Sequence, residues 1–153
     1  MAIVSAICNS FKQEILVEGH NFTNGTDAFK LALFTSSATL SKSTTAYTAP
    51  ADGTASPTNT HEVSSTSTGY TTGGNALTST TPVLSGDTAC CKFADTSFTS
   101  ASFTARGCLI YNSTNANKAV CSINFGADKT VTSGTFTIQF PAQTAGNAII
   151  QIA

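Results

Sequence analysis

The feature that most limits the possible folds is a regular two-residue alternation of apolar and polar side chains between residues 102 and 140. The alternation falls in three runs, at 103–112, 118–125 and 135–140. Clusters of Asn, Ser, Gly and Asp separate the runs, and these residues favour turns because their side chains bond the local backbone or because they tolerate positive φ. Successive side chains of a strand point to opposite faces, so this pattern predicts an antiparallel meander with one face buried.

Further strands are expected on both sides of this meander. The predicted strands are Phe29–Phe34, Ala76–Leu84, Thr88–Phe93 and Ala148–Ile152. The first has only one polar side chain and is expected to be buried on both faces. The pattern as a whole predicts a mainly β fold, an antiparallel β-sandwich or barrel-like domain with one N-terminal amphipathic helix.

The expected helix covers residues 1–18, where apolar side chains recur every four residues at Ile3, Ile7, Phe11 and Ile15. This spacing places one apolar stripe along a helix. Gly19 supplies a stop signal. The stripe would lie on the protein's own sheet or dock on a neighbouring subunit.

The remaining polar stretch, residues 46–68, is predicted to be an exposed loop excursion within a single domain of residues 1–153. It contains Pro50, Pro57 and few apolar side chains, so burial would offset little of the conformational entropy lost on ordering it. Loops of this length in a compact domain are commonly binding loops or insertions. We therefore expect this excursion to lie at a contact with another subunit or with the surface to which the protein binds.

Only 10% of the residues are charged and the net charge is −1, while 41% are hydrophobic. A nucleic-acid-binding surface requires clustered cations, and the seven Lys and Arg residues are spread singly, so no nucleic-acid partner is expected. The N-terminal apolar positions are interrupted by polar ones, which predicts neither a signal peptide nor a membrane span. A surface with so few charges is typical of a protein that works inside an assembly.

Five cysteines form an odd set without any C-x-x-C spacing, so a thiolate metal site is not expected. They are Cys8, Cys90, Cys91, Cys108 and Cys121. Small buried thiols of a protein made in a reducing compartment are the favoured interpretation, and a single disulfide is the alternative.

Candidate catalytic groups are sparse. His20 and His61 both fall in predicted loops without a partner at helical spacing, and they are interpreted as solvated side chains. The glycines of 69–74 lack the lysine of a phosphate-binding loop. Arg106 is interpreted as an ion-pairing residue within the sheet or at an interface. No catalytic residue, cofactor or metal is expected, and the chain is predicted not to be an enzyme.

Several segments carry a resemblance to a known group of proteins. They are Ala6–Glu14, Phe29–Ser36, Gly69–Gly74, Ala105–Asn112 and Ala148–Ala153. These short segments are distributed over nearly the whole chain, and in them the sequence resembles small virion structural proteins of tailed bacteriophages. The resemblance implies a non-enzymatic component of the phage particle that is assembled in the bacterial cytoplasm.

Among such roles a capsid decoration (cement) protein bound to the major capsid protein is favoured, as a homo-oligomer and most simply a trimer. A tail component, such as a tube or fibre-associated subunit, is one alternative. A carbohydrate-binding β-sandwich that uses Tyr47 and Tyr70 is another, weakened by the absence of Trp. The candidate interface residues are Ile3, Ile7, Phe11, Ile15, Tyr47, Tyr70 and Arg106.

Overall fold

The computed structural model of the chain describes residues 2–48 and 61–153. Its elements in chain order are β1 (Ala6–Ile7), α1 (Asn9–Glu14), the 3-10 turn η1 (Ile15–Val17), β2 (Phe29–Phe34), β3 (Asn75–Leu77), β4 (Val83–Ser85), β5 (Thr88–Cys91), β6 (Thr96–Asn112), β7 (Lys118–Ile138) and β8 (Ile150–Ile152). The prediction of a mainly β fold with antiparallel pairing and one short N-terminal helix is confirmed.

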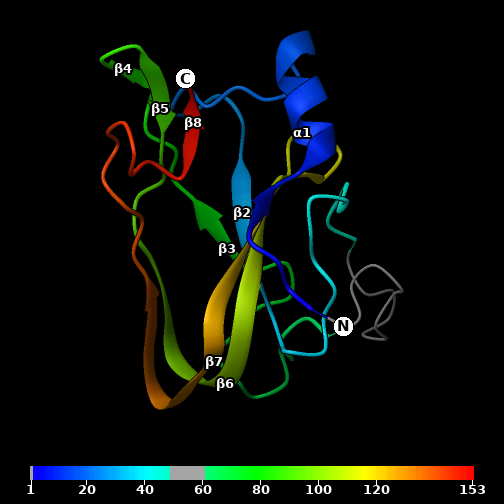
Figure 1. Cartoon of the computed structure of the whole chain (residues 1–153). Helices are drawn as coiled ribbons and strands as arrows, with labels where there is room; N and C mark the ends of the chain where they lie inside the picture. The colour runs from blue at the N-terminus through cyan, green and yellow to red at the C-terminus, as the bar shows by residue number, and fades with distance from the viewer. Residues whose placement is uncertain (1, 49–60) are drawn as a thin grey trace.

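The strands form two antiparallel sheets. The larger has the order β1-β7-β6-β2-β3 and the smaller the order β4-β5-β8. Figure 1 shows the smaller sheet and α1 at the same end of the molecule, with the long strands β6 and β7 reaching away to the opposite end. No helix among the described residues is both long and apolar enough to cross a membrane.

The predicted three-stranded meander is wrong, because residues 96–138 form one long hairpin of two strands. A five-residue turn joins β6 to β7, as expected from its Asn and Ser residues, and Thr96 pairs with Ile138 at the far end. The apolar run at 135–140 therefore pairs with the beginning of β6 and not with the run before it. The turn-forming residues 126–134 do not end the strand but produce irregularities within it, including positive φ at Gly126 and Ser133.

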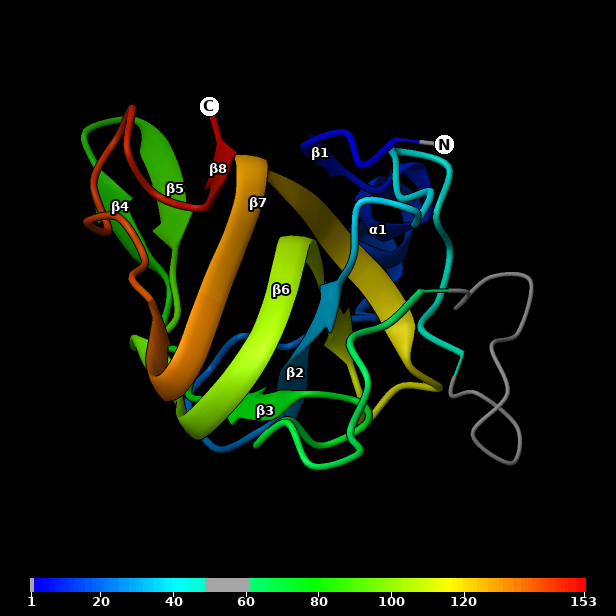
Figure 2. The ribbon, with the colours of Figure 1, turned by 90° about the horizontal axis from the view of Figure 1, so that it is seen from below.

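The hairpin bends sharply near its middle. Gly107 pairs with Asn124 and Ala105 pairs with Lys129, so one residue of β6 opposes four residues of β7. Such an excess on one strand bends it and increases the local twist. We call the part nearer the turn (107–112 with 118–124) the proximal half and the rest (96–105 with 129–138) the distal half. Figure 2 shows the two halves diverging like the arms of a V.

Two contacts stabilise the bend. Arg106 Nε donates to Asp128 Oδ1 at 2.7 Å across the bulge. Both side chains are partly exposed, so the pair adds little stability but fixes the position of the two strands. At Gly107 a Cβ atom would lie 2.3 Å from the carbonyl oxygen of Ile123, so only glycine allows the strands to approach this closely.

Contacts between phenylalanine rings pack the smaller sheet against the larger one. The ring of Phe93, which follows β5, lies 5.4 Å from that of Phe29 on β2 and 5.6 Å from that of Phe140. Phe22 stacks on Phe29 at 4.6 Å. Buried aromatic pairs of this kind contribute about 0.5–1.5 kcal/mol each beyond the area that they remove from water.

The N-terminal helix is shorter than predicted. Residues 3–7 are extended, with β1 paired to β7 at Ser122 and Cys121, and helical structure begins only at Asn9. The four-residue spacing of Ile3 and Ile7 is an even number, so it also places both side chains on one face of a strand. Backbone bonds to distant segments, such as Val4 N–H to Leu40 O at 2.8 Å, decide between the two structures.

The other predicted elements have mixed outcomes. β2 has the predicted bounds, and β8 confirms the terminal strand. The predicted strand Ala76–Leu84 is divided into β3 and β4. Most of the predicted excursion at 46–68 lies outside the described residues, and its described parts include the buried side chains of Tyr47 and Val63.

Phe11 gives a test of the packing of α1 against the core. Its side chain is buried against the rings of His20, at 4.9 Å, and Phe22, at 6.0 Å. Phe11→Ala is expected to lower the free energy of unfolding by about 3–5 kcal/mol, because it leaves a cavity. The control Leu16→Ala removes a side chain that is 83% exposed and should change it by less than about 0.5 kcal/mol. Urea unfolding of both variants measures the difference, and equal small effects would contradict this packing.

Candidate functional site

A partly buried carboxylate, Glu62, is the centre of the first polar cluster. Its Oε1 accepts bonds from the Tyr70 hydroxyl at 2.6 Å and from the Gly73 N–H at 2.7 Å, and its Oε2 accepts from the Tyr47 hydroxyl at 3.0 Å. The Tyr70 hydroxyl in turn accepts the N–H of Leu33 on β2 at 3.0 Å. The cluster thus joins separate parts of the connection between β2 and β3 to each other and to the main sheet.

The electrostatics of this cluster favour neutral phenols. Burial, and after it the negative charge of Glu62, raise the pKa of Tyr70 well above its ordinary value. The same two causes raise the pKa of Tyr111, whose hydroxyl donates to the Gly73 carbonyl at 2.8 Å. A catalytic phenol would need contact with a substrate, and these side chains are buried. The arrangement is suited to holding the fold together.

Replacing Glu62 tests that role. Glu62→Gln keeps an acceptor but removes the charge and turns an amide N–H₂ toward a hydroxyl donor, so we expect a loss of about 1–3 kcal/mol in the free energy of unfolding. Glu18→Gln, at an exposed position, is the matched control and should have little effect. Thermal or urea unfolding of both variants gives the comparison, and equal stability of the two would refute the anchoring role.

The second polar cluster surrounds His20, which is buried and not solvated as predicted. Asn112 Oδ1 accepts the N–H groups of Thr114 and Asn115, so its Nδ2 group is the donor to Asp27 at 2.7 Å and faces His20 Nδ1 at 3.2 Å. His20 Nδ1 is therefore an acceptor and Nε2–H donates to Glu14 at 2.8 Å.

These contacts decide what the histidine can do. Both ring nitrogens are used inside the protein and the side chain has no exposed surface, so no nitrogen is left for a substrate. An open pocket of about 740 Å³ lies beside the cluster, and its lining residues include Ile15, Glu18, His20 and Pro82. The cluster joins α1 to the end of β6 and closes this part of the core.

All five cysteines are buried and free, as the favoured interpretation predicted. Burial is the main cause that raises the pKa of the Cys8 thiol to about 11 and those of Cys91 and Cys121 to about 12. Burial likewise raises the pKa of Cys108 well above its ordinary value. Protonated, inaccessible thiols are poor nucleophiles, so these side chains act as small apolar residues.

Alkylation distinguishes buried from exposed thiols. At pH 8 the folded protein should react slowly with iodoacetamide, because all five thiols are buried and burial raises the pKa values of Cys8, Cys91, Cys108 and Cys121. In denaturant without reductant all five cysteines should be labelled, as measured by intact mass. Labelling of only three would show that a disulfide had formed and would overturn the reduced state. A surface cysteine introduced as Thr99→Cys supplies the reactive control.

The described part of the chain offers no group of three His, Cys, Asp or Glu side chains placed to hold a metal ion. His61 is partly exposed, and its carbonyl accepts bonds from the backbone N–H and the hydroxyl of Thr35. It takes part in anchoring the segment that follows β2.

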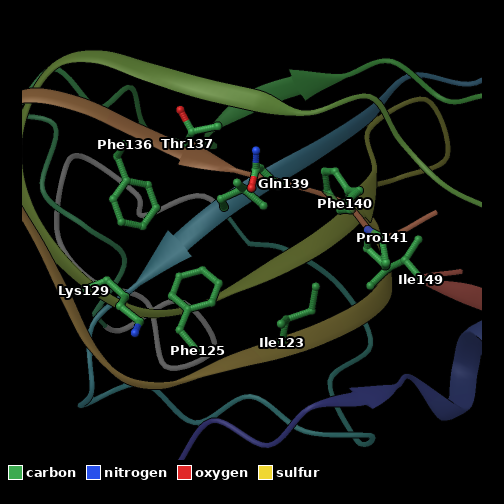
Figure 3. Close-up of a pocket in the computed structure, with 10 residues that line it drawn as sticks. Ile123, Phe125, Lys129, Phe136, Thr137, Gln139, Phe140, Pro141 and Ile149 are labelled. Atoms are coloured by element: carbon green, nitrogen blue, oxygen red, sulfur yellow. The ribbon is translucent and has the colours of Figure 1, made fainter. Parts of the chain in front are cut away.

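An open apolar groove of about 460 Å³ lies beside the bend of β7 (Figure 3). We call it the β7 groove, and its lining residues are Ile123, Phe125, Lys129, Phe136, Thr137, Ile138, Gln139, Phe140, Pro141 and Ile149. Consecutive residues of a strand point to opposite faces. Because the last three residues of β7, 136–138, all border this groove, it reaches the edge of the strand and does not lie over one face alone.

Large apolar side chains are also exposed elsewhere. Leu16 is 83% and Val17 is 71% exposed after α1, and Leu84 is 76% exposed on β4, with Val83 beside it. Isolated exposed apolar residues are normal on protein surfaces, but adjacent pairs at element ends are candidates for contact with other proteins.

The structure places the predicted interface residues as follows. Ile3, Phe11, Tyr47 and Tyr70 are buried in the protein's own core, whereas Ile7, Ile15 and Arg106 are partly exposed. The four buried side chains offer no area to a partner, and an interface role for the other three stays a prediction. Burial of the two tyrosines also removes the exposed rings on which the carbohydrate-binding alternative depended.

Sequence reasoning missed the β7 groove and the exposed pairs 16–17 and 83–84. The one available signal was that Leu16 and Val17 lie outside the four-residue apolar stripe. Comparisons with protein-family models, with curated proteins and with solved structures found no match to this chain.

Proposed function

We propose that the protein is a non-enzymatic structural subunit of a tailed-bacteriophage particle, most simply a decoration protein that binds the major capsid protein as a homo-oligomer, with a trimer favoured. The resemblance of nearly the whole chain to small phage virion proteins supports the class. In the virion such a subunit would stabilise the head by bridging neighbouring capsid subunits.

The use of the polar side chains is in keeping with a structural role. The buried groups that could carry out acid–base chemistry are bonded to carboxylates of the fold: His20 donates to Glu14, and Tyr47 and Tyr70 donate to Glu62. The five thiols are buried. The conspicuous features of the described surface are instead exposed apolar side chains and an apolar groove.

The observation that carries the proposal is the exposed pair Leu16 and Val17 at the end of α1. Leaving both side chains in water forgoes about 1.5–3 kcal/mol for each that could be buried. A docked capsid surface would bury them. We assign this pair to the capsid contact, separate from the contacts between copies of the chain.

Binding to heads tests the assignment. Purified protein is mixed with undecorated phage heads and sedimented, and the bound fraction is measured against protein concentration. Replacing both Leu16 and Val17 by Ser should raise the dissociation constant at least tenfold, because the contact loses apolar burial. Val4→Ser changes a half-exposed apolar residue elsewhere and serves as the control.

Unfolding curves of both variants should match the wild type, which separates lost binding from lost folding. Wild-type protein that binds tails but never heads would replace the capsid assignment with the tail alternative. Wild-type protein that binds no phage particle, while binding sugars on a glycan array, would overturn the structural role altogether.

A further inference from the structure

Several strand edges lack a partner strand among the described residues, and two of them lie beside exposed apolar features. The edge of β6 in the distal half is covered, because Ser102 N–H donates to Thr68 O and Asn75 Nδ2 donates to Ser97 O, both at 2.9 Å. The opposite edge, on β7, pairs with no other described strand beyond its short contact with β1. The second open edge is β4, which pairs only with β5.

The two open edges differ in shape. The β7 edge borders the β7 groove, and Figure 3 shows Phe125 and Phe136 among the apolar side chains that line it. This combination of free backbone groups and an apolar pocket is what an added strand requires. The β4 edge instead projects, since Leu84 is 76% exposed and Val83 is 46% exposed.

The two edges carry little of the charge that normally prevents strand pairing. Charged residues, prolines, bulges and covering loops are the usual protection. No charged residue occurs from 130 to 142, and none occurs in β4, although Pro141 follows β7 and Pro82 precedes β4. One edge borders an apolar groove and the other projects apolar side chains, so the two are complementary in shape and in polarity.

The nearby charges are complementary as well. Lys129 is the single charged residue of the β7 groove and lies beside Phe125 and Phe136 in Figure 3. Its neighbour Asp128 is already paired with Arg106. Asp87, three residues after Leu84, is exposed, and within residues 2–48 and 61–153 neither Asp87 nor Lys129 forms an ion pair.

The two edges of one chain cannot meet each other. In the smaller sheet β5 separates β4 from β8, and Ile149, just before β8, lies in the wall of the β7 groove. The groove thus adjoins the β8 side of this sheet, and the free edge of β4 faces away from it. A strand that fills the groove must come from another molecule.

We propose that the β4–β5 hairpin of one copy docks in the β7 groove of the next copy, with Leu84 in the apolar pocket and Asp87 next to Lys129. The partner of the groove is thus a second copy of this chain. The contact is head-to-tail, so each copy uses a different surface on each side. Such contacts form a ring when the rotation between copies closes and a filament when it does not, and the proposal takes the closed ring of three. This inference rests on the homo-oligomer of the proposed function and names its contact surfaces, but it does not depend on a role in the virion.

Light scattering after size exclusion tests the contact. The wild type should have a mass about three times the 15.7 kDa of one chain, and Leu84→Glu or Phe125→Glu should each give monomers of 15.7 kDa. Leu16→Glu changes an equally exposed leucine outside both surfaces and should leave the oligomer intact. A monomeric wild type, or an intact Leu84→Glu oligomer, would overturn the proposal.

Mixing the two monomeric variants is the decisive experiment. The Leu84→Glu variant has an intact β7 groove, and the Phe125→Glu variant has an intact β4–β5 hairpin. The hairpin of the second should therefore dock in the groove of the first and give a one-to-one dimer, to which no further copy can be added. If the groove paired with the groove of another copy, no dimer of this kind would form. Because association requires folded protein, formation of the dimer also shows that both variants fold.

Charge reversal provides a second measurement at exposed positions. Asp87→Lys and Lys129→Asp should each weaken self-association about tenfold, and the double variant should recover it, because the pair is restored with opposite polarity. Failure of the double variant to recover would reject this placement of the hairpin. A wild-type ring that binds no phage heads would leave this inference standing and would remove only the capsid role.

Discussion

The antiparallel pairing of two strands of unequal length is the constraint on which the rest of the structure depends. β6 has 17 residues and β7 has 21, and most of the excess is taken up where Arg106 opposes four residues. A straight hairpin would have left both faces of its distal half in water. The bend instead allows Phe136 to approach Phe125 across the V, at 6.2 Å between ring centroids, and it brings Phe98 and Phe103 against Tyr70. The β7 groove is the part of this V that the chain itself does not fill.

This chain has few charges, and several of its eight carboxylates bond other parts of the fold. Glu14, Glu62 and Asp27 accept bonds from buried side chains, and Asp95 accepts the N–H of Phe140 at 2.9 Å. Each of these bonds joins segments that are distant in sequence or fixes a connection between strands. In the proposed oligomer, hydroxyl and apolar groups of the surface would recognise the partner by fit and by strand pairing. The polar clusters around Glu62 and His20 are therefore networks whose members bond within the fold.

The parts of the fold that were predictable are those that depend on local pattern. β2 was predicted because one uninterrupted apolar run is flanked by polar residues, and the turn between β6 and β7 because Asn and Ser dominate it. The bend was not predictable, since Gly126 and Ser133 are equally compatible with a loop and with a bulge inside a strand. The burial of Tyr70 and His20 depends on partners 8 to 92 residues away, which periodicity does not reveal. The β7 groove is formed by segments that come together only in the tertiary structure, so no local residue pattern predicted it.

The position of β1 has a consequence for synthesis on the ribosome. Residues 3–7 lie against β7, where Ser122 Oγ donates to Val4 O at 2.7 Å and Asn124 Nδ2 donates to Ile3 O at 2.7 Å. The apolar side chains of residues 3–7 therefore have no partner strand until β7 is made, more than a hundred residues later. At about 5–20 residues per second this delay lasts about 5–20 seconds, during which Ile3 and Ile7 are open to chaperones or to other nascent chains. The long hairpin, closed by a short turn, can form as soon as β7 emerges, and the N-terminal strand is then the edge that completes the sheet.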